Sequence, residues 1–313
     1  DLRRLTTLRP SPKAMFGVTF LSIWATMLRF HLFPDTPLLH HYPSRLCTEP
    51  TRVLIVVKTY PSNHRLRQAI RETIGHKAVT SAFLWRVLFY MGNTEDKNTS
   101  QFLRKEIWKE DVFIAPYSAE SSNVVMVFIE TARWIHEKCT PQLEYLVHIN
   151  DTTFPDLLAL HEYIDKLDET DRNFHCNDKH LVPVGKHPTD SLYIPQTHFK
   201  DDLIPGYCES DAFVLKAQHL KVLVLASEAI PQYPLFGPYV TGHLTVLARL
   251  GHTSISGMID VASNNPDWSS QALFVTGLKK PSLWKEYWIK RWLKHSHVTN
   301  VTSLLASKVL SSL

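Results

Sequence analysis

An alternation of short apolar runs with longer amphipathic segments constrains the fold of this chain more than any other feature. Residues 52–58 (RVLIVVK) form a β-branched run typical of a buried parallel strand. Further strands are expected at 87–91, 112–115, 145–149 and 212–215. Helices are expected at 63–74, 99–110, 124–139, 157–167 and 216–229. Strands that alternate with helices predict an α/β fold, with a mostly parallel sheet covered by helices on both faces.

Two positions at the ends of the expected strands are the first candidates for a binding site. In open α/β sheets, ligands bind beyond the carboxyl ends of the strands. The loop after Lys58 and the turn Asn150-Asp151-Thr152 both follow such ends. Asp151 could therefore serve as a ligand, or it could be a turn-forming residue after a strand.

Composition and motif content argue against several functional classes. The chain has only 10 glycines, and none of them lies in a dinucleotide-binding, P-loop or α/β-hydrolase pattern. The formal charge is +4, and the Lys and Arg residues are spread along the chain. A nucleic-acid partner is therefore not expected.

The amino-terminal segment has the pattern of a signal anchor. Basic residues precede an uncharged run at 14–28, and the apolar character resumes through residue 33. We expect residues 1–13 to be a cytoplasmic tail, 14–33 a transmembrane helix and 34–50 a stem. The alternatives are a cleaved signal peptide and a buried helix. An anchor would make this a single-pass type II membrane protein.

The cysteines and the sequons fit an oxidising compartment without requiring one. The four cysteines, Cys47, Cys139, Cys176 and Cys208, show no C-x-x-C spacing. One or two structural disulfides are possible, and the pairing stays open. Asn98 and Asn300 begin sequons that would be glycosylation sites in a lumenal domain.

Several ordered segments resemble glycosyltransferase family 31, the β-1,3-galactosyltransferase and β-1,3-N-acetylglucosaminyltransferase group. The segment RLRQAIRETIG at 65–75 is similar to that family's R-R-x-A-I-R-x-T-W-G helix. HINDTTF at 148–154 lies where the family has K-x-D-D-D-x-F. Cys139, Tyr207-Cys208 and the segment at 239–251 match further motifs. The resemblance covers residues 52–256 in the expected order.

This resemblance implies a GT-A fold, a UDP-sugar donor, a glycan acceptor, Mn²⁺ and transfer in β-1,3 linkage in the Golgi lumen. It implies that Arg67, Arg71, Asn150 and Asp151 bind the nucleotide sugar, and that Asp151 binds the metal. An arginine fork suits phosphate oxygens, although both arginines could equally form a solvated helix face. Cys139 and Cys208, which lie in matched motifs, are the disulfide candidates.

The sequence departs from the family pattern at the expected site. The acidic triplet is reduced to the single carboxylate of Asp151, and Phe236-Gly237 replaces the acidic pair that would supply the base. Two hypotheses follow. The site is rebuilt with Glu209 or Asp211 as a replacement carboxylate, or the chain is an inactive member that acts as a binding or chaperone-like partner.

The carboxyl-terminal segment, residues 276–313, is expected to form an amphipathic helix and a tail after a transferase domain at 51–275. Trp284, Trp288 and Trp292 recur every four residues among Lys and Arg. Such a stripe can dock on the domain or lie on a membrane surface. We favour docking.

Overall fold

The computed structural model describes residues 40–139, 142–262 and 271–296, without the side chains of residues 210, 211 and 294–296. Within these residues, no helix is long and apolar enough to cross a membrane. The expected anchor at 14–33 lies outside the described residues.

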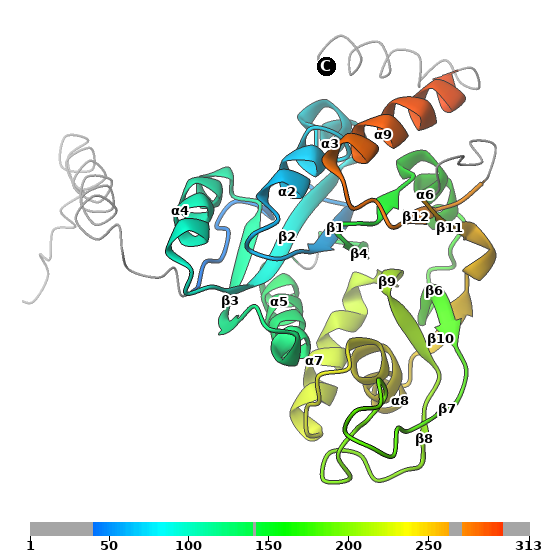
Figure 1. Ribbon diagram of the computed structural model, residues 1–313. Helices are drawn as coiled ribbons and strands as arrows, with labels where there is room; N and C mark the ends of the chain where they lie inside the picture. Colours follow the sequence, from blue (N-terminus) through cyan, green and yellow to red (C-terminus); the bar gives the residue numbers. More distant parts are fainter. Residues whose placement is uncertain (1–39, 140–141, 263–270, 297–313) are drawn as a thin grey trace, which may run out of the picture.

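A seven-stranded sheet with the order β10-β6-β9-β4-β1-β2-β3 forms the centre of the fold (Figure 1). Its strands are β1 (Val53–Lys58), β2 (Trp85–Asn93), β3 (Val112–Ser118), β4 (Tyr145–Asn150), β6 (Asn173–Lys179), β9 (Tyr207–Lys216) and β10 (Gly251–Ser254). Strands β4, β1, β2 and β3 pair in parallel, and β9 runs antiparallel to β4 and β6. The expected α/β fold with a mostly parallel sheet is confirmed.

The short strands form two small sheets beside the main one. They are β5 (Phe154–Pro155), β7 (Val182–Pro183), β8 (Leu203–Ile204), β11 (Ile259–Val261) and β12 (Phe274–Thr276). β12 lies between β11 and β5, and β7 pairs with β8. These strands of two or three residues carry too little periodicity to be recognised in the sequence.

The helices pack on both faces of the main sheet. They are α2 (His64–Arg71), α3 (Lys77–Phe83), α4 (Lys97–Glu106), α5 (Val124–Cys139), α6 (Leu157–Ile164), α7 (Leu220–Ala229), α8 (Leu244–Ala248) and α9 (Pro281–Ser296). A π-helix, Gly237–His243, leads directly into α8. The α2, α4, α6 and α7 helices are shorter than the sequence predicted, because α2 and α6 end early and short 3₁₀ turns flank α4 and α7.

Strand β1 explains why the sheet needs helices on both faces. Val53, Ile55 and Val57 belong to the core that includes α2, α6 and α9, whereas Leu54 and Val56 belong to the core that includes α5 and α7. Successive side chains of a strand point to opposite faces, so a strand with no polar position must be covered twice. The run at 52–58 thus determines a three-layer arrangement.

The expected stem overlaps the folded domain, which corrects the boundary at residue 50. His41 bridges to Ile114 of β3, and Cys47 forms a disulfide with Cys139 at the end of α5. Leu46 is buried in the core. Residues 40–50 therefore belong to the domain, because a disulfide and apolar burial fix them against it.

The boundary expected at residue 275 is also wrong, because it divides β12 and separates α9 from its packing partners. Trp284, Trp288 and Trp292 are buried, and α9 lies along α2 (Figure 1). Docking of the tryptophan stripe is therefore confirmed. The indole Nε1 of Trp284 donates to the backbone oxygen of Asp151 at 3.1 Å, so this helix supports the turn after β4.

Candidate functional site

An open cleft of about 420 Å³ lies at the carboxyl ends of the parallel strands. Lys58, the last residue of β1, and Tyr60 line one wall. Tyr207 and Glu209 at the start of β9 and Phe236 before the π-helix line the other. The cleft is therefore at the edge where open α/β sheets bind ligands.

The side chain of Lys58 comes close to the opposite wall of the cleft. In the sheet it is level with Tyr90 of β2 and Asn150 of β4. Its ammonium nitrogen lies 5.7 Å from the centroid of the Phe236 ring, which is within the range of a cation–π contact. The cleft thus has a positive charge beside an aromatic surface.

Phe236 occupies the position at which the family pattern has an acidic residue. Its side chain is only 5% exposed and stacks on the ring of His148, with 5.1 Å between the ring centroids. Gly237 follows because a Cβ there would lie 2.5 Å from the carbonyl oxygen of Cys208. The π-helix therefore packs tightly on β9, and Phe236-Gly237 supplies no base.

His148 is enclosed in this aromatic cluster. It stacks on Phe213 as well, and its Nε2 is 2.7 Å from the hydroxyl of Tyr90. Burial lowers the pKa of His148 well below its usual value, and the charge of Lys58 adds to this effect. A neutral imidazole that is fully buried fills space behind the cleft and makes no contact with a ligand in it.

Asp151 follows β4, but its carboxylate is turned into the protein. The Oδ2 atom accepts hydrogen bonds from Thr59 at 2.6 Å and Asn63 at 2.8 Å. Burial raises the pKa of Asp151, and these hydrogen bonds and the nearby cations counter only part of that rise. Here Asp151 joins the loop after β1 to the turn after β4.

The donor set around Asp151 does not fit a Mn²⁺ ion. No group of three His, Cys, Asp or Glu side chains able to hold a metal occurs among the described residues. Thr152, the next residue of the former acidic triplet, has no carboxylate. Hard divalent cations take several oxygen ligands, so one hydrogen-bonded carboxylate is a poor site.

Arg67 and Arg71 of α2 are held in an ion-pair network below the cleft. Arg67 is fully buried; it pairs with Glu106 at 2.7 Å and donates to the carbonyl oxygens of Tyr60 and Pro61. Arg71 pairs with Glu106 and Asp111.

Burial lowers the pKa of Arg67. Burial by itself would raise the pKa of Glu106, but the two guanidinium groups outweigh this effect and the pKa of Glu106 is lowered. Glu106 is therefore held in its ionised form between the two arginines. Arg67 fixes the loop after β1, and Arg71 joins α2 to Glu106 of α4 and to Asp111 before β3. This geometry does not favour the diphosphate role that the resemblance implies for them.

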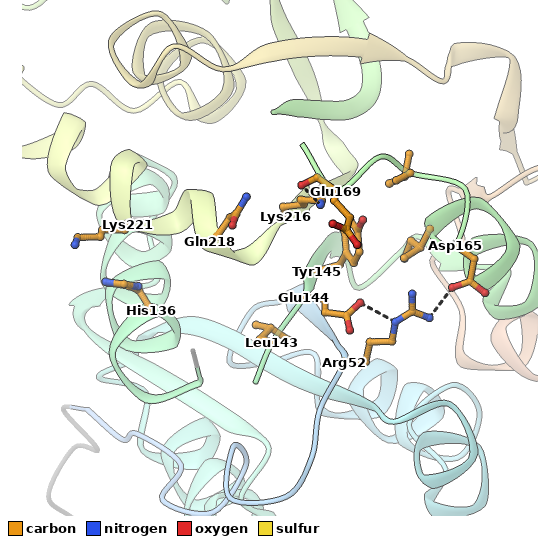
Figure 2. A pocket seen from close by; sticks show the side chains of 12 residues that line it. Arg52, His136, Leu143, Glu144, Tyr145, Asp165, Glu169, Lys216, Gln218 and Lys221 are labelled. Atoms are coloured by element: carbon orange, nitrogen blue, oxygen red, sulfur yellow. Dashed lines mark hydrogen bonds and ion pairs between the residues drawn. The ribbon is translucent and has the colours of Figure 1, made fainter. Parts of the chain in front are cut away.

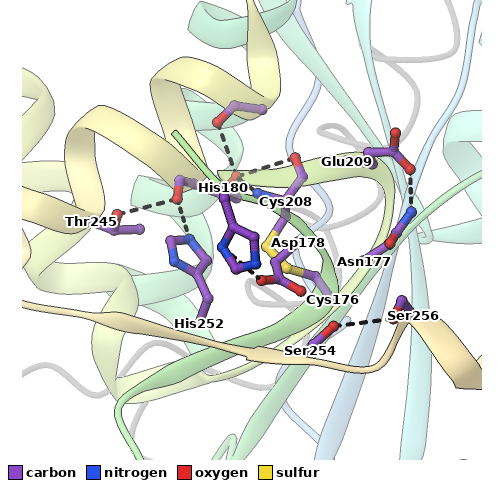
Figure 3. The surroundings of a disulfide bond; sticks show 12 residues. Cys176, Asn177, Asp178, His180, Cys208, Glu209, Thr245, His252, Ser254 and Ser256 are labelled. Carbon is purple, nitrogen blue, oxygen red and sulfur yellow. Dashed lines mark hydrogen bonds and ion pairs between the residues drawn. A yellow bond between two sulfur atoms is a disulfide. The ribbon is translucent and has the colours of Figure 1, made fainter. Parts of the chain in front are cut away.

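Glu209 is the carboxylate that lines the cleft. Its Oε1 pairs with Lys179 at 3.0 Å and its Oε2 accepts from Asn177, while 42% of its side chain remains exposed. Figure 3 shows Glu209 next to the disulfide between Cys176 and Cys208, which joins β6 to β9. The disulfide and the Asn177 contact hold Glu209 at the start of β9.

The other residues predicted from the sequence have mixed outcomes. Asn150 is half-buried at the end of β4, beside Lys58 in the sheet. Asp211 lies in β9, and its side chain is outside the described part. Asn98 is exposed near the start of α4, as a glycosylation site must be. Asn300 lies outside the described residues.

All four cysteines form disulfides, namely Cys47 with Cys139 and Cys176 with Cys208. Both disulfide candidates, Cys139 and Cys208, are thus bonded, each to a partner that the sequence did not identify. The pairing depends on which strands are neighbours in the sheet, and β6 escaped sequence recognition because its segment is largely polar.

The loop after Lys58, which contains Tyr60, was expected to lie at the site, but Lys58, Tyr60 and Tyr207 were not named individually as binding residues. A signal existed for Lys58, since it is the last residue of the most apolar strand and faces the edge where ligands bind. The motif match at Tyr207-Cys208 marked this segment, but its place in the cleft depends on an antiparallel strand that joins a parallel sheet.

A second cavity, of about 690 Å³, lies at the opposite edge of the sheet. Residues at the amino-terminal ends of β1 and β4 line it. Arg52 crosses it between Glu144 and Asp165, at 2.9 and 2.6 Å (Figure 2). These charges satisfy one another, so we place the functional site at the carboxyl ends of the strands.

Residues 65–255, more than half of the chain, match the family model described as Galactosyltransferase. This chain belongs to the galactosyltransferase family. The matched range begins in α2 and ends just after β10, so it includes every residue of the cleft except Lys58 and Tyr60. The resemblance to glycosyltransferase family 31 is confirmed, and the chain is a member of the β-1,3-glycosyltransferase group.

Relatives of this galactosyltransferase-family chain are distant. It is 22% identical over 206 residues to rat lactosylceramide 1,3-N-acetyl-beta-D-glucosaminyltransferase, covering 63% of this chain and 54% of that protein. It is 22% identical over 181 residues to human beta-1,3-galactosyltransferase 9, covering 57% and 49%. The chain thus spans about half the length of these relatives.

Among solved structures, a glycosyltransferase involved in the glycosylation of the major capsid of PBCV-1 is similar at a TM-score of 0.37. The sequence identity is 10%, and the match covers 75% of this chain and 98% of the other.

Proposed function

We propose that this chain is a UDP-sugar-dependent β-1,3-hexosyltransferase that acts on a glycan acceptor in the Golgi lumen. One observation carries the proposal: a partly exposed carboxylate, Glu209, lines the same cleft as the cation Lys58. The cleft lies at the carboxyl edge of the sheet, and family membership supports the choice of donor class and linkage.

In the proposed reaction, Glu209 is the general base. Its carboxylate takes the proton of an acceptor hydroxyl while that oxygen bonds to the anomeric carbon of the donor sugar. The bond from this carbon to the β-phosphate oxygen breaks, and UDP leaves. A carboxylate can act in this way when it reaches the hydroxyl directly or through one water.

The surrounding residues support this role for Glu209. Asn177 and Lys179 of β6 contact its two oxygens and orient the group. The exposed ring of Tyr60 and the half-buried ring of Tyr207 offer surfaces on which a sugar or a base can stack.

The proposed lumenal location is supported by the disulfides. All four cysteines are bonded, and structural disulfides persist mainly in oxidising compartments. Membrane attachment through residues 14–33 is part of the same proposal. It is tested by whether the full chain remains with membranes after washing in high salt and carbonate.

A second candidate function is that of a non-catalytic partner with the same fold. The observation that favours it is Phe236, a buried ring where the family pattern has an acid. A protein of this kind would bind a nucleotide, a glycan or another transferase without turning over a donor.

The experiment that separates the two candidates combines UDP binding with turnover. The full chain in detergent is titrated with UDP while its Tm is followed, because a ligand of the native state raises stability. UDP release is then measured with UDP-hexoses and β-galactoside acceptors. Binding with turnover supports the transferase, and binding without turnover supports the partner.

The variant Glu209→Gln tests the base itself. We expect it to lower the turnover rate about 10²- to 10⁴-fold, while the Tm shift with UDP is unchanged. Glu95→Gln, an exposed glutamate outside the cleft, is the matched control. Full turnover in Glu209→Gln would remove this residue from the reaction.

A further inference from the structure

We propose that a cavity at the amino-terminal ends of β2 and β3 binds a sulfate or phosphate group of a ligand from outside the chain. This cavity has a volume of about 290 Å³. It shares no lining residue with the cleft that contains Glu209. The inference therefore does not rest on the proposed transferase function.

The first step of the argument is the place of the cavity in the fold. It is lined by Arg86 near the start of β2, by Asp111 just before β3, by Lys77 at the start of α3 and by Arg45 in the segment before β1. β1, β2 and β3 are parallel, and the cleft lies where β1 ends. The two sites are therefore at opposite edges of the sheet.

The second step is the excess of positive charge around the cavity. Its lining contains five cationic side chains and three carboxylates: Arg45, Arg71, Lys77, Arg86 and Lys109, and Glu49, Glu110 and Asp111. Two of the cations are engaged in ion pairs, Arg86 with Glu49 and Arg71 with Asp111. A hollow with more fixed cations than carboxylates attracts an anion.

Glu110, the third carboxylate, is held mainly by main-chain donors. Its Oε2 accepts from the N–H groups of Ser44 at 2.6 Å and Arg45 at 3.3 Å, and from the hydroxyl of Ser44 at 3.2 Å. Lys109 donates to the neutral amide of Gln68 at 3.0 Å, and its charge also acts on Asp111. The carboxylates are thus already engaged, and positive charge remains in excess.

Arg45 and Lys77 are the cations available to a ligand. Both side chains are exposed, and neither makes a hydrogen bond or an ion pair with another residue in the part of the chain that the structure describes. An arginine fork matches two oxygens of a sulfate or phosphate group, and a lysine adds a compact charge. The exposed hydroxyl of Ser81, in the same lining, can donate a further hydrogen bond.

The size of the cavity favours a single charged group. Pockets for small molecules begin at roughly 300 Å³, so the rest of a larger ligand would lie outside. In the larger cavity beside β1 and β4, by contrast, Arg52 is already paired with Glu144 and Asp165. A free inorganic anion and an ester on a glycan share the chemistry that Arg45 and Lys77 recognise, and the test has an arm for each.

The test measures binding to the full chain in detergent by calorimetry at low salt. The probes are inorganic sulfate, inorganic phosphate, a heparin oligosaccharide and the same oligosaccharide without its sulfate groups. We expect the sulfated oligosaccharide to bind and the desulfated one not to bind. Binding should weaken as salt is added, because the cations are exposed.

Arg45→Met and Lys77→Met should each raise the Kd about 10-fold, as expected for the loss of one charge-assisted contact. Lys77→Arg should keep most of the affinity. Lys97→Met removes one positive charge from the exposed surface of α4, outside the cavity, and should leave the Kd unchanged. Methionine keeps the aliphatic stem, so the variants should fold, and far-UV circular dichroism checks this.

The outcomes separate the source of the anion and the two proposals. Binding of an inorganic anion supports a free ligand, and binding of the sulfated oligosaccharide alone supports an ester. The inference is overturned if no probe binds, if Arg45→Met and Lys77→Met bind like the natural chain, or if Lys97→Met weakens binding equally. Anion binding without sugar transfer supports the inference while the proposed transferase function fails, and transfer without anion binding has the opposite meaning.

Discussion

The two walls of the cleft differ in how their polar groups are used. On the β1 and β4 side, Asp151 and Arg67 are buried and bonded to neighbouring loops. On the β9 side, Glu209 is partly exposed and held by surface contacts. The residues that carry the family resemblance lie mainly on the first wall, and there they stabilise the fold.

This difference shows that residues of a family motif can be retained because they stabilise the fold, even where the acidic residues that act with them in the family pattern are absent. A buried charge that loses its partner is strongly destabilising, so an established ion-pair network resists change. An exposed carboxylate at the cleft carries no such constraint. The chemistry of this chain is therefore to be tested on the β9 wall, and its stability on the β1 wall.

The largest effect should come from Arg67→Met. It removes one of the two guanidinium groups that donate to Glu106 and the donor to the carbonyl oxygens of Tyr60 and Pro61, so we expect a loss of about 3–5 kcal/mol in the free energy of unfolding. Urea denaturation measures it. Arg65→Met, on the exposed side of the same helix, should change stability little. Equal effects of the two variants would contradict the division between the walls.

The next effect should come from removing the disulfide beside Glu209. Cys176→Ala with Cys208→Ala should lower stability by about 2–4 kcal/mol and also reduce turnover, because Glu209 loses its anchor. Cys47→Ala with Cys139→Ala, which removes the disulfide between the segment before β1 and the end of α5, is the matched control outside the cleft. It should lower stability without a change in turnover per folded molecule. If both pairs affect turnover alike, Glu209 is not specifically positioned by its disulfide.

A smaller effect, dependent on pH, should come from His148→Phe. Because the pKa of His148 in the folded state lies below that of the unfolded chain, the unfolded state binds more protons below about pH 6.5. Stability therefore falls as the pH drops below that value, by up to about 1.4 kcal/mol per pH unit.

Phenylalanine removes this contribution, so the stability of the variant should depend less on pH between 7.5 and 5.5. His41 and His243, whose pKa values burial also lowers, are present in both proteins and cancel in the comparison. Urea midpoints at three pH values give the slopes. Parallel slopes would mean that His148 takes up protons equally in the folded and the unfolded chain, which would contradict the lowered pKa.

The smallest effect on stability should come from Lys179→Met. This lysine is exposed and its pair with Glu209 lies at the surface, so the Tm should not change measurably. If the lysine orients the base, turnover per folded molecule should fall, because the carboxylate loses one of its two side-chain contacts. Unchanged turnover would limit the positioning of Glu209 to Asn177 and the disulfide.

Much of the parallel half of the fold could be predicted from the sequence. The β-branched run of β1 and the apolar periodicity of α5 depend on local patterns, and they appear where expected. The antiparallel half was harder. β6 and β10 are largely polar, and their pairing with neighbours is not encoded locally. The π-helix Gly237–His243 was not expected either, because no sequence periodicity distinguishes it from other short helical segments.

For the candidate site, the sequence by itself showed which acidic residues of the family pattern are missing. One carboxylate, that of Asp151, remains in the turn after β4, and Phe236-Gly237 stands in place of the acidic pair. The sequence also determined the sheet with two covered faces, because a strand without polar positions must be buried on both sides. Only the tertiary structure decided where the remaining charges point. Asp151 and Arg67 turn inward while Lys58 and Glu209 meet at one cleft, because burial and partners, which depend on distant segments, determine whether a charged group supports the fold or faces a ligand.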